Sequence, residues 1–300
     1  MNTTFPHTDK SWNVSLHGGH SSAFCDHAES ALEDIAHAAI AAGCPLYGIT
    51  EHAPRVEPHH LYDEERAMGW TVETLDQLFT EYAAAVDRLR EQLADRIILL
   101  KGFEAEVIPE DRYADLMLGL RKRFNFQYMV GSVHWVAGHI IDYRRDHFDL
   151  AADACGGVEA LAVRYYETVA EMVRRLRPEI IGHLDIVRRH APSEESVSTP
   201  KVRAAAFKAL DVIREHECIL DVNTGGYRKG FGRPFPAAWL TEAARDRGIV
   251  FCFGDDSHRV SEVCLDIPEA RRYLLTCGVD AITALQPEGA RLTRRTISLT

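Results

Sequence analysis

Short apolar runs alternate with longer amphipathic stretches along most of this chain, and this alternation limits the folds that it can adopt. Runs that suit β-strands cover residues 13–17, 46–50, 97–102, 126–133, 180–181, 218–222 and 249–253, and stretches with helical periodicity cover residues 28–42, 74–93, 158–176, 201–216 and 237–247. Such alternation predicts a parallel sheet covered by helices. Seven or so repeats of the unit predict a closed or nearly closed α/β barrel. A doubly wound open sheet is the alternative, but no Gly-x-Gly-x-x-Gly sequence follows the first strand.

Length and composition favour a single domain over residues 1–300. Of the 300 residues 46% are hydrophobic, and α/β barrels commonly reach this length as one domain. The most linker-like stretch, residues 191–200, is polar and rich in proline and serine. It is so short that it suits a surface loop better than a hinge.

Charge and cysteine usage restrict the partners and the compartment. The formal net charge is −11 and no block of lysines and arginines recurs, which argues against nucleic-acid binding but allows a small phosphorylated substrate held by one or two arginines. The seven cysteines form no Cys-x-x-Cys pair, which is typical of a reducing compartment. There is no signal-peptide core and no apolar run long enough to cross a bilayer, so we expect a cytoplasmic protein without a membrane partner. The oligomeric state is left open.

Residues that can bind metal ions follow almost every predicted strand. They are His17, His20, His27, His52, Glu104, His134, His183, Asp256 and His258. In a βα barrel the C-terminal ends of all strands converge on one face, where active sites lie. We therefore expect these nine side chains to meet in one pocket, although any one of them alone is also explained as a hydrogen-bonded structural residue.

The donor atoms of this set point to divalent metal ions. Imidazole nitrogens and carboxylate oxygens suit zinc, iron, manganese or cobalt. One tetrahedral ion needs only about four ligands, so the set predicts two or three ions, with Glu104 or Asp256 as a bridging ligand. Glu104, Asp256 and His258 are predicted to be catalytic, and His139 and His147 could also line the pocket. Surface or packing roles are expected for His37, His59, His60, His216, Cys25 and Cys252.

Taken in order, these motifs resemble those of the polymerase-and-histidinol-phosphatase (PHP) superfamily, and within it the monofunctional histidinol-phosphatase branch. The resemblance runs from His17 to His258 and is carried by residues 17–28 (His-Gly-Gly-His-Ser-Ser-Ala-Phe-Cys-Asp-His-Ala), 48–54, 101–106, 131–134, 182–185, 221–229 and 254–258. It implies a distorted (β/α)7 TIM-like barrel with a trinuclear metal centre at the C-terminal ends of the strands. The implied ligand groups are His17, His20, Glu104 and Asp256 for one metal, Glu104, His134 and His183 for a second, and His27, His52 and His258 for a third.

The first motif departs from the family pattern. The family usually opens with His-x-His, whereas two glycines separate His17 from His20 in this chain. His20 fits the spacing to His27, which makes His17 the less secure ligand. Either the backbone bulges to bring His17 into the centre, or that metal site is weakened.

The resemblance implies a metal-dependent phosphatase with L-histidinol phosphate as the favoured substrate. Metal ions would lower the pKa of a bridging water and hold phosphate oxygens during in-line attack. Arg228 and Arg188 would bind the phosphate through their planar guanidinium groups, and residues 59–69 and 143–156 would form the leaving-group pocket. The alternatives are another PHP phosphoesterase, such as a nucleotide or broad-specificity phosphatase or a phosphodiesterase, and a metal-binding protein without catalysis.

Overall fold

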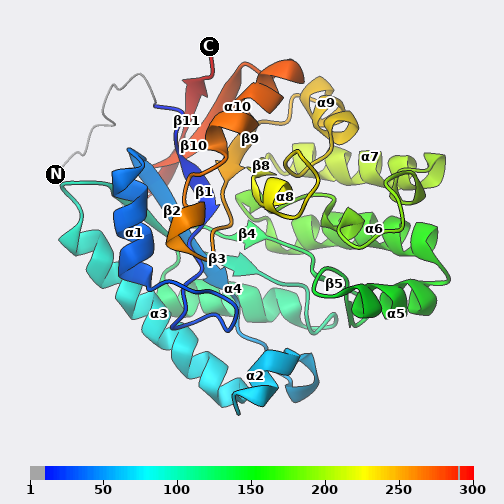
Figure 1. Cartoon of the computed structure of the whole chain (residues 1–300), viewed down its shortest axis with the longest axis horizontal. Coiled ribbons are helices and arrows are strands. Elements are labelled where there is room, and N and C mark those ends of the chain that lie inside the picture. The colour runs from blue at the N-terminus through cyan, green and yellow to red at the C-terminus, as the bar shows by residue number, and fades with distance from the viewer. Residues whose placement is uncertain (1–10, 290) are drawn as a thin grey trace.

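A computed structural model describes residues 11–289 and 291–300. Within these residues, seven strands form one sheet in which all paired neighbours are parallel. In sheet order they are β1 (Ser15–Gly18), β2 (Leu46–His52), β3 (Ile98–Ala105), β4 (Val130–Gly131), β7 (Ile180–Ile181), β8 (Ile219–Asn223) and β9 (Phe251–Gly254) (Figure 1). Sheet order follows chain order, so all the strand ends that carry predicted ligands meet at the same edge.

The two outer strands of the sheet approach each other and nearly close the barrel. The amide of Asp256, just after β9, donates to the carbonyl of His17 in β1 at 2.8 Å, and the amide of His20 donates to the carbonyl of Ser257 at 2.8 Å. The prediction of a distorted, seven-stranded βα barrel is therefore confirmed, and the doubly wound alternative is wrong.

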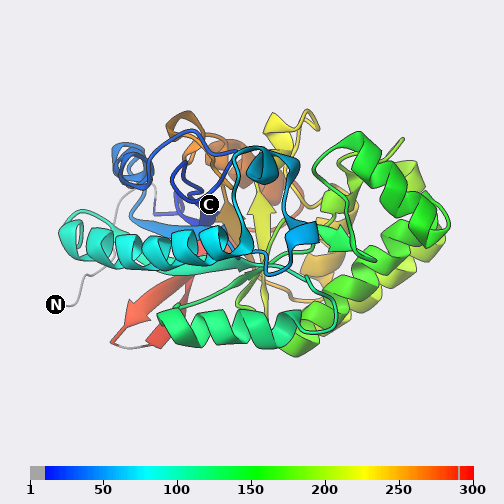
Figure 2. The same cartoon turned by 90° about the horizontal axis from the view of Figure 1, so that it is seen from below.

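A helix follows each of the seven strands. The helices are α1 (Leu32–Ala41), α3 (Val72–Gln92), α4 (Tyr113–Phe124), α6 (Val158–Leu176), α7 (Pro200–Glu215), α9 (Ala238–Asp246) and α10 (Ile267–Thr276), and Figure 2 shows them arranged around the strands. In α3, Leu75, Phe79, Tyr82 and Val86 recur at helical spacing and are buried, and the hydroxyl of Thr71 caps the first turn by accepting from Thr74 N. Among the described residues, none of the helices combines the length and apolar character needed to cross a membrane.

The barrel helices α4 and α10 were not predicted from the sequence, and neither were several short elements. The short elements are η1 (Pro58–His60), α2 (Asp63–Ala67), β5 (Trp135–Val136), β6 (His139–Ile140), α5 (Arg145–Cys155), η2 (Ile186–Arg188), η3 (Glu195–Val197), α8 (Gly225–Arg228) and η4 (Val260–Glu262). Most of them lie in the connections that follow the C-terminal ends of the strands. They therefore shape the rim of the site more than the barrel itself.

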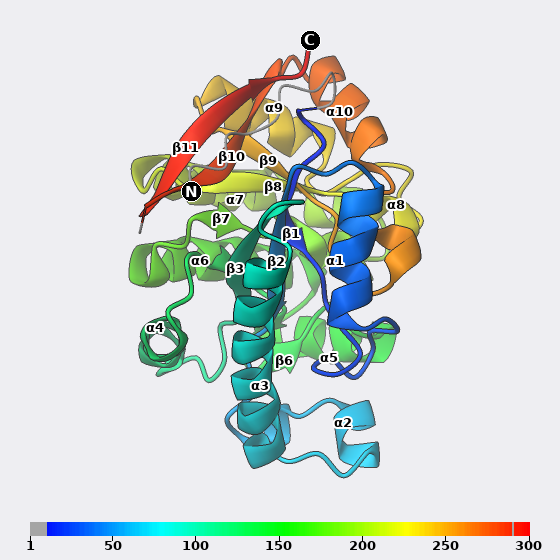
Figure 3. The ribbon, with the colours of Figure 1, turned by 90° about the vertical axis from the view of Figure 1, so that its left-hand side faces the viewer.

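The chain ends in an antiparallel hairpin of β10 (Ala281–Glu288) and β11 (Arg291–Ser298), which was also not predicted. Ile282, Leu285 and Ile297 of this hairpin are buried and join the barrel core. Figure 3 shows the hairpin at the opposite end of the molecule from α2. Since α2 belongs to the rim at the C-terminal ends of the strands, the hairpin stands away from the candidate site.

Candidate metal centre

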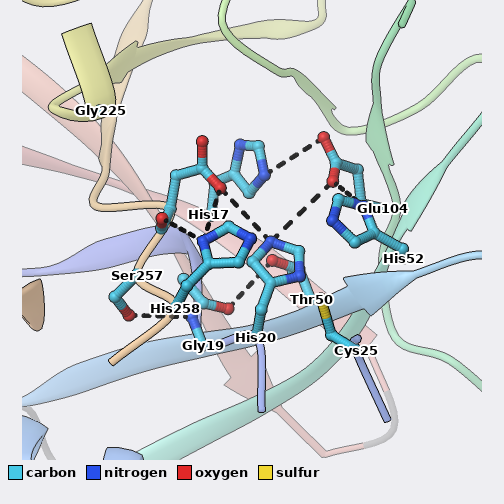
Figure 4. Close-up of polar contacts among 12 residues, drawn as sticks. His17, Gly19, His20, Cys25, Thr50, His52, Glu104, Gly225, Ser257 and His258 are labelled. Carbon is cyan, nitrogen blue, oxygen red and sulfur yellow. Dashed lines mark hydrogen bonds and ion pairs between the residues drawn. The ribbon is translucent and has the colours of Figure 1, made fainter. Parts of the chain in front are cut away.

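Glu104, near the end of β3, lies at the centre of a buried cluster of imidazoles. Its side chain is only 2% exposed. The nitrogen atoms around its carboxylate are His52 Nδ1 at 2.7 Å and His20 Nε2 at 3.9 Å from Oε2, and His183 Nε2 at 3.0 Å, His17 Nε2 at 3.4 Å and His134 Nε2 at 3.5 Å from Oε1. Figure 4 shows His17, His20 and His52 gathered around this carboxylate. Five imidazoles from the ends of four strands thus face a single side chain.

The segment after β9 contributes the second part of the cluster. Asp256 Oδ1 lies 3.3 Å from His20 Nε2, and the rings of His52 and His258 stack on the ring of His20 at centroid distances of 4.2 and 4.3 Å. His27 lies at the edge of this group: its side chain is 39% exposed, and its ring centroid is 4.7 Å from that of His258. The structure therefore brings eight of the nine predicted ligands into one cluster and leaves His27 at its rim.

A β-bulge in β1 places His17 in the cluster. Ser15 pairs with Tyr47 and Gly18 pairs with Ile49, so three steps along β1 match two steps along β2. A Cβ atom on Gly18 would lie 2.5 Å from the Tyr47 hydroxyl, and the following Gly19 has a φ of +72°, so both positions favour glycine. Of the two alternatives raised by the His-Gly-Gly-His sequence, the structure has the bulge.

Three further carboxylates orient the imidazoles. Their contacts are Asp221 Oδ2 with His17 Nδ1 at 2.8 Å, Glu51 Oε1 with His20 Nδ1 at 3.1 Å, and Glu106 Oε2 with His134 Nδ1 at 2.5 Å. Each contact occupies one ring nitrogen and directs the other toward the centre, as carboxylate–histidine pairs do beside metal ions. These roles were not predicted, although Glu51, Glu106 and Asp221 all lie within the strand-end motifs and could have been found there.

Several polar atoms at the centre that could bind a metal ion lack a hydrogen-bond partner. Nε2 of His17, His20 and His258 is buried without such a partner among the described residues. Each unpaired buried polar group costs about 1–3 kcal/mol, so the protein alone leaves this cluster under-satisfied. Divalent metal ions would pair these atoms, and the residues present fit that role.

The spacing of donor atoms defines groups that could each hold an ion. His17, His20 and Glu104 form one such group and Glu104, His134 and His183 a second, each with ligand atoms within 4.8 Å of one another. The second matches a predicted group in full, and the first matches the other predicted Glu104 group except that Asp256 is missing. A third group contains Cys25 with His20, His52 and His258, and so differs from the predicted set by including His20 and Cys25 and omitting His27.

The carboxylates also control the protonation of the imidazoles. Burial lowers the pKa of His20, but the neighbouring carboxylates of Asp256 and Glu51 raise it to about 9. Burial also lowers the pKa of His134, but the charge on Glu106 helps to raise it to about 10. The pKa of His52 is lowered to about 4 by burial, with the charge on His20 adding to the effect. The metal-free cluster therefore holds protons at neutral pH that incoming cations would displace.

Two predicted ligands have unusual backbone conformations. His183 has a φ of +23° and Asp256 a φ of +48°, both in the left-handed region. Such conformations cost about 1–3 kcal/mol each for residues other than glycine and concentrate at functional sites. They direct both side chains inward directly after β7 and β9.

A cavity of about 290 Å³ opens onto the cluster. Besides His52, Glu104 and Asp256 its walls contain the cationic side chains of Arg189, Arg228, Lys229 and Arg259. Arg228 is fixed in place because its Nη2 donates to the carbonyls of Asp255 at 2.5 Å and Asp256 at 3.0 Å. The cavity therefore combines candidate metal ligands with positive charge, which suits an anionic ligand.

Arg188 requires a correction, because the structure does not bring it to this cavity. Its side chain is buried, with Nε 3.2 Å from Asp185 Oδ2 and the guanidinium 4.4 and 4.5 Å from the ring centroids of Phe231 and Phe235. The next residue, Arg189, lines the cavity instead. The sequence could not separate the two neighbours, since they lie at the end of η2, where successive side chains point in different directions.

The segments predicted to form the leaving-group pocket, residues 59–69 and 143–156, line a second hollow of about 160 Å³. Its walls include Tyr62, Trp135, His139, Tyr143 and His147. The ring of Tyr62 lies parallel to that of Tyr143 at 5.3 Å and 6.4 Å from the ring of His27, which lines the main cavity. The two hollows are therefore neighbours.

Comparison with known proteins gives a consistent result. The family described as PHP domain matches residues 17–225. A protein of Schizosaccharomyces pombe named "Probable histidinol-phosphatase" is 32% identical over 283 residues, which cover 92% of this chain and 91% of that protein. The histidinol-phosphatase of Saccharomyces cerevisiae is 22% identical and is matched over 86% of this chain and 87% of its own.

A solved structure has the same fold. The histidinol phosphate phosphatase of Lactococcus lactis, crystallised with Zn, L-histidinol and phosphate, superposes with a TM-score of 0.70 over 93% of this chain and 98% of its own, at 19% identity.

Proposed function

This chain belongs to the PHP-domain family, in its histidinol-phosphatase branch, and on that basis we propose that it hydrolyses L-histidinol phosphate to L-histidinol and phosphate with two or three divalent metal ions. The observation that carries the proposal is the Glu104 carboxylate, which lies within 4 Å of five imidazole nitrogens and opens onto a cavity with several cationic side chains. Metal ligands next to fixed cations suit a phosphate ester better than an uncharged substrate.

The metal ions are the least defined part of the proposal. The residues that would hold them are His17, His20, His27, His52, Glu104, His134, His183, Asp256 and His258. Divalent ions bound there would supply a nucleophile at neutral pH by acidifying water, and would offset charge on the phosphate. The donor set leaves zinc, iron, manganese and cobalt as candidates.

The protein's own cations would bind and orient the phosphate. Arg228 is held by the backbone beside Asp256, so its guanidinium is positioned before substrate arrives. Lys229 Nζ lies 3.7 Å from Asp256 Oδ2, and Arg189 lies on the same cavity wall. We expect these three side chains to hold the phosphate oxygens that face away from the metals.

Asp142 offers a way to recognise the rest of the substrate. It lines the cavity, and its Oδ2 lies 3.5 Å from Nη1 of Arg189, whose positive charge favours the ionised carboxylate. An ionised carboxylate there would pair with the ammonium group of histidinol phosphate, which nucleotides and sugar phosphates lack. This contact would favour histidinol phosphate over the substrates of other PHP phosphoesterases.

The test is phosphate release by purified protein of known metal content. We expect kcat/KM for L-histidinol phosphate to exceed that for nucleotide and sugar phosphates by several orders of magnitude. Equal or faster turnover of the other esters would make the chain a different PHP phosphoesterase, and no turnover of any ester by the fully loaded protein would refute phosphatase activity. Asp142→Asn should raise KM for histidinol phosphate but not for 3-(imidazol-4-yl)propyl phosphate, which has no amine.

A further inference from the structure

A second group of side chains of types that can bind a metal ion lies outside the centre described above, on the connection between β2 and α3. Glu57 Oε2 is 3.3 Å from His59 Nε2 and 3.8 Å from His60 Nδ1. The ligand atoms of these three residues lie within 4.8 Å of one another. All three belong to the segment around η1 and share no residue with the cluster at Glu104.

His60 has a buried ring nitrogen whose hydrogen-bonding capacity is unused. The residue is only 5% exposed, and its Nδ1 is buried without a hydrogen-bond partner among the described residues. The ring packs edge-on against Trp135 at a centroid distance of 5.1 Å, which fixes its direction. Burial lowers the pKa of His60, which favours the neutral ring, and a neutral imidazole can offer one nitrogen lone pair to a cation. A buried ring nitrogen therefore lies 3.8 Å from a carboxylate oxygen without a hydrogen bond to it.

Glu57 is held in its ionised form, which is the form that binds a cation. Nη2 of Arg112 donates to Glu57 Oε1 at 2.5 Å, and this hydrogen bond holds the pKa of Glu57 below its usual range. The bond uses Oε1 and leaves Oε2 facing the two histidines. Arg112 thus orients the carboxylate without occupying the side that a metal would use.

The distances suit a small tetrahedral ion. Zinc binds imidazole nitrogen and carboxylate oxygen at about 2.0–2.2 Å, which places neighbouring ligand atoms about 3.3–3.5 Å apart. The separation of Glu57 Oε2 from His59 Nε2 already has this value. His60 Nδ1, at 3.8 Å, needs to move only a few tenths of an ångström closer to Glu57 Oε2. His59 is 71% exposed, so its side chain can adjust freely.

We propose that Glu57, His59 and His60 form a separate divalent-metal site, suited to zinc, with solvent at the fourth position. Two imidazoles and one carboxylate match the donors of three-ligand zinc sites. His59 also lines the hollow beside Tyr62, so a bound ion would restrict the movement of His59 in the wall of this hollow. The site is independent of the proposed phosphatase activity.

The first test counts zinc ions. Protein with its main centre fully loaded is titrated with zinc chloride by calorimetry, and the bound zinc is then measured by elemental analysis. Wild-type protein should bind one more zinc ion per chain than His59→Gln. The matched control is His37→Gln, an exposed histidine on α1, which should bind as much zinc as the wild type. Equal zinc binding by wild type and His59→Gln would overturn the proposal.

A second measurement identifies the ligands directly. Diethyl pyrocarbonate modifies accessible imidazoles, and peptide mass spectrometry reports the extent at His59. Zinc should slow this modification severalfold in the wild type but not in Glu57→Gln, which retains both histidines and lacks the carboxylate. Unchanged modification of wild-type His59 with zinc present, or equal protection in Glu57→Gln, would refute the assigned ligands. Neither readout depends on catalysis, so failure of the phosphatase proposal leaves this one standing.

Discussion

Nδ1 of His17 lies 2.8 Å from the carboxylate of Asp221, which joins β1 to β8 at the floor of the metal centre. Both side chains are fully buried. The contact occupies one nitrogen of the ring and leaves Nε2 directed at Glu104, 3.4 Å away. Asp221 is therefore a positioning residue for a candidate ligand, although it does not contact the cavity itself.

Asp221→Asn should weaken this arrangement without removing any ligand. Because the amide is less basic than the carboxylate, we expect metal affinity or kcat/KM to fall about 10–100-fold, the usual cost of losing such a partner. Metal content after dialysis and steady-state kinetics measure both quantities. Asp153→Asn, at an exposed position of α5, is the control. A variant with wild-type metal content and activity would show that Asp221 does not orient His17.

Gly18→Ala should disrupt the bulge in β1. The added Cβ would lie 2.5 Å from the Tyr47 hydroxyl and 2.6 Å from Asp255 Oδ1. These two buried groups are hydrogen-bonded to each other, so we expect the strand to shift and to carry His17 with it. We expect loss of at least one bound metal ion and a fall in kcat/KM of more than about 10-fold.

Gly119→Ala is the matched control for that change. Gly119 lies in α4 with open space at its Cβ, so alanine there should stabilise the protein by about 0.5–1 kcal/mol. Normal metal content in Gly18→Ala would mean that the bulge is not needed to place His17.

Arg189→Ala and Arg188→Ala should give opposite phenotypes. Arg189 lines the cavity, and a charge-assisted hydrogen bond is worth about 1.5–3 kcal/mol, so its removal should lower kcat/KM about 10–100-fold with little change in Tm. Removal of Arg188 leaves Asp185 buried and unpaired, which should cost about 3–5 kcal/mol of stability. Steady-state kinetics of both variants measures the change in kcat/KM, and thermal unfolding measures the loss of stability. A large kinetic defect in a stable Arg188→Ala protein would restore that residue as a phosphate ligand.

Asp185 should make stability depend on pH in a defined direction. Burial raises its pKa to about 6 in the folded protein, whereas an unfolded aspartate titrates near 3.8. Between these values the folded state binds more protons than the unfolded state, so this residue's contribution to stability falls as pH rises from about 4 to 6. Two pKa units correspond to about 3 kcal/mol.

The comparison with Asp185→Asn isolates this contribution, because asparagine does not titrate. The stability of the variant relative to wild type should improve by up to about 3 kcal/mol between pH 4 and pH 7. Urea unfolding of the metal-free proteins at several pH values measures the difference. A relative stability that is constant with pH, or that changes in the opposite direction, would contradict the raised pKa.

The barrel and its cluster of candidate ligands could be predicted from the sequence because almost every strand is an apolar run followed by a side chain that can bind a metal ion. Strand ends of a parallel barrel must meet, so Glu104 and His183 could be placed together without knowing any distance. The helix predicted over residues 158–176 coincides with α6, since its apolar spacing and its end before Arg177 are both visible in the sequence.

Features that depend on a shift of a single residue along a strand or helix could not be predicted from the sequence. The choice between Arg188 and Arg189 rests on the rotation of a single turn of η2, and the position of His17 rests on a bulge. The pairing of Glu51 with His20 requires the ends of β1 and β2 to be aligned closely enough for a contact of 3.1 Å. The hairpin of β10 and β11 was missed because its alternation of buried and exposed residues is weak and β11 is rich in arginine.

The bulge in β1 has a practical consequence for recognising proteins of this kind. A search pattern that demands a single residue between the first two histidines would reject this chain, even though the bulge delivers His17 to within 3.4 Å of Glu104. An inserted residue inside a strand can be absorbed locally, so letter spacing in an alignment is a poorer criterion than the separation of donor atoms in space. Chains that fail the spacing criterion can therefore still hold a complete set of ligands.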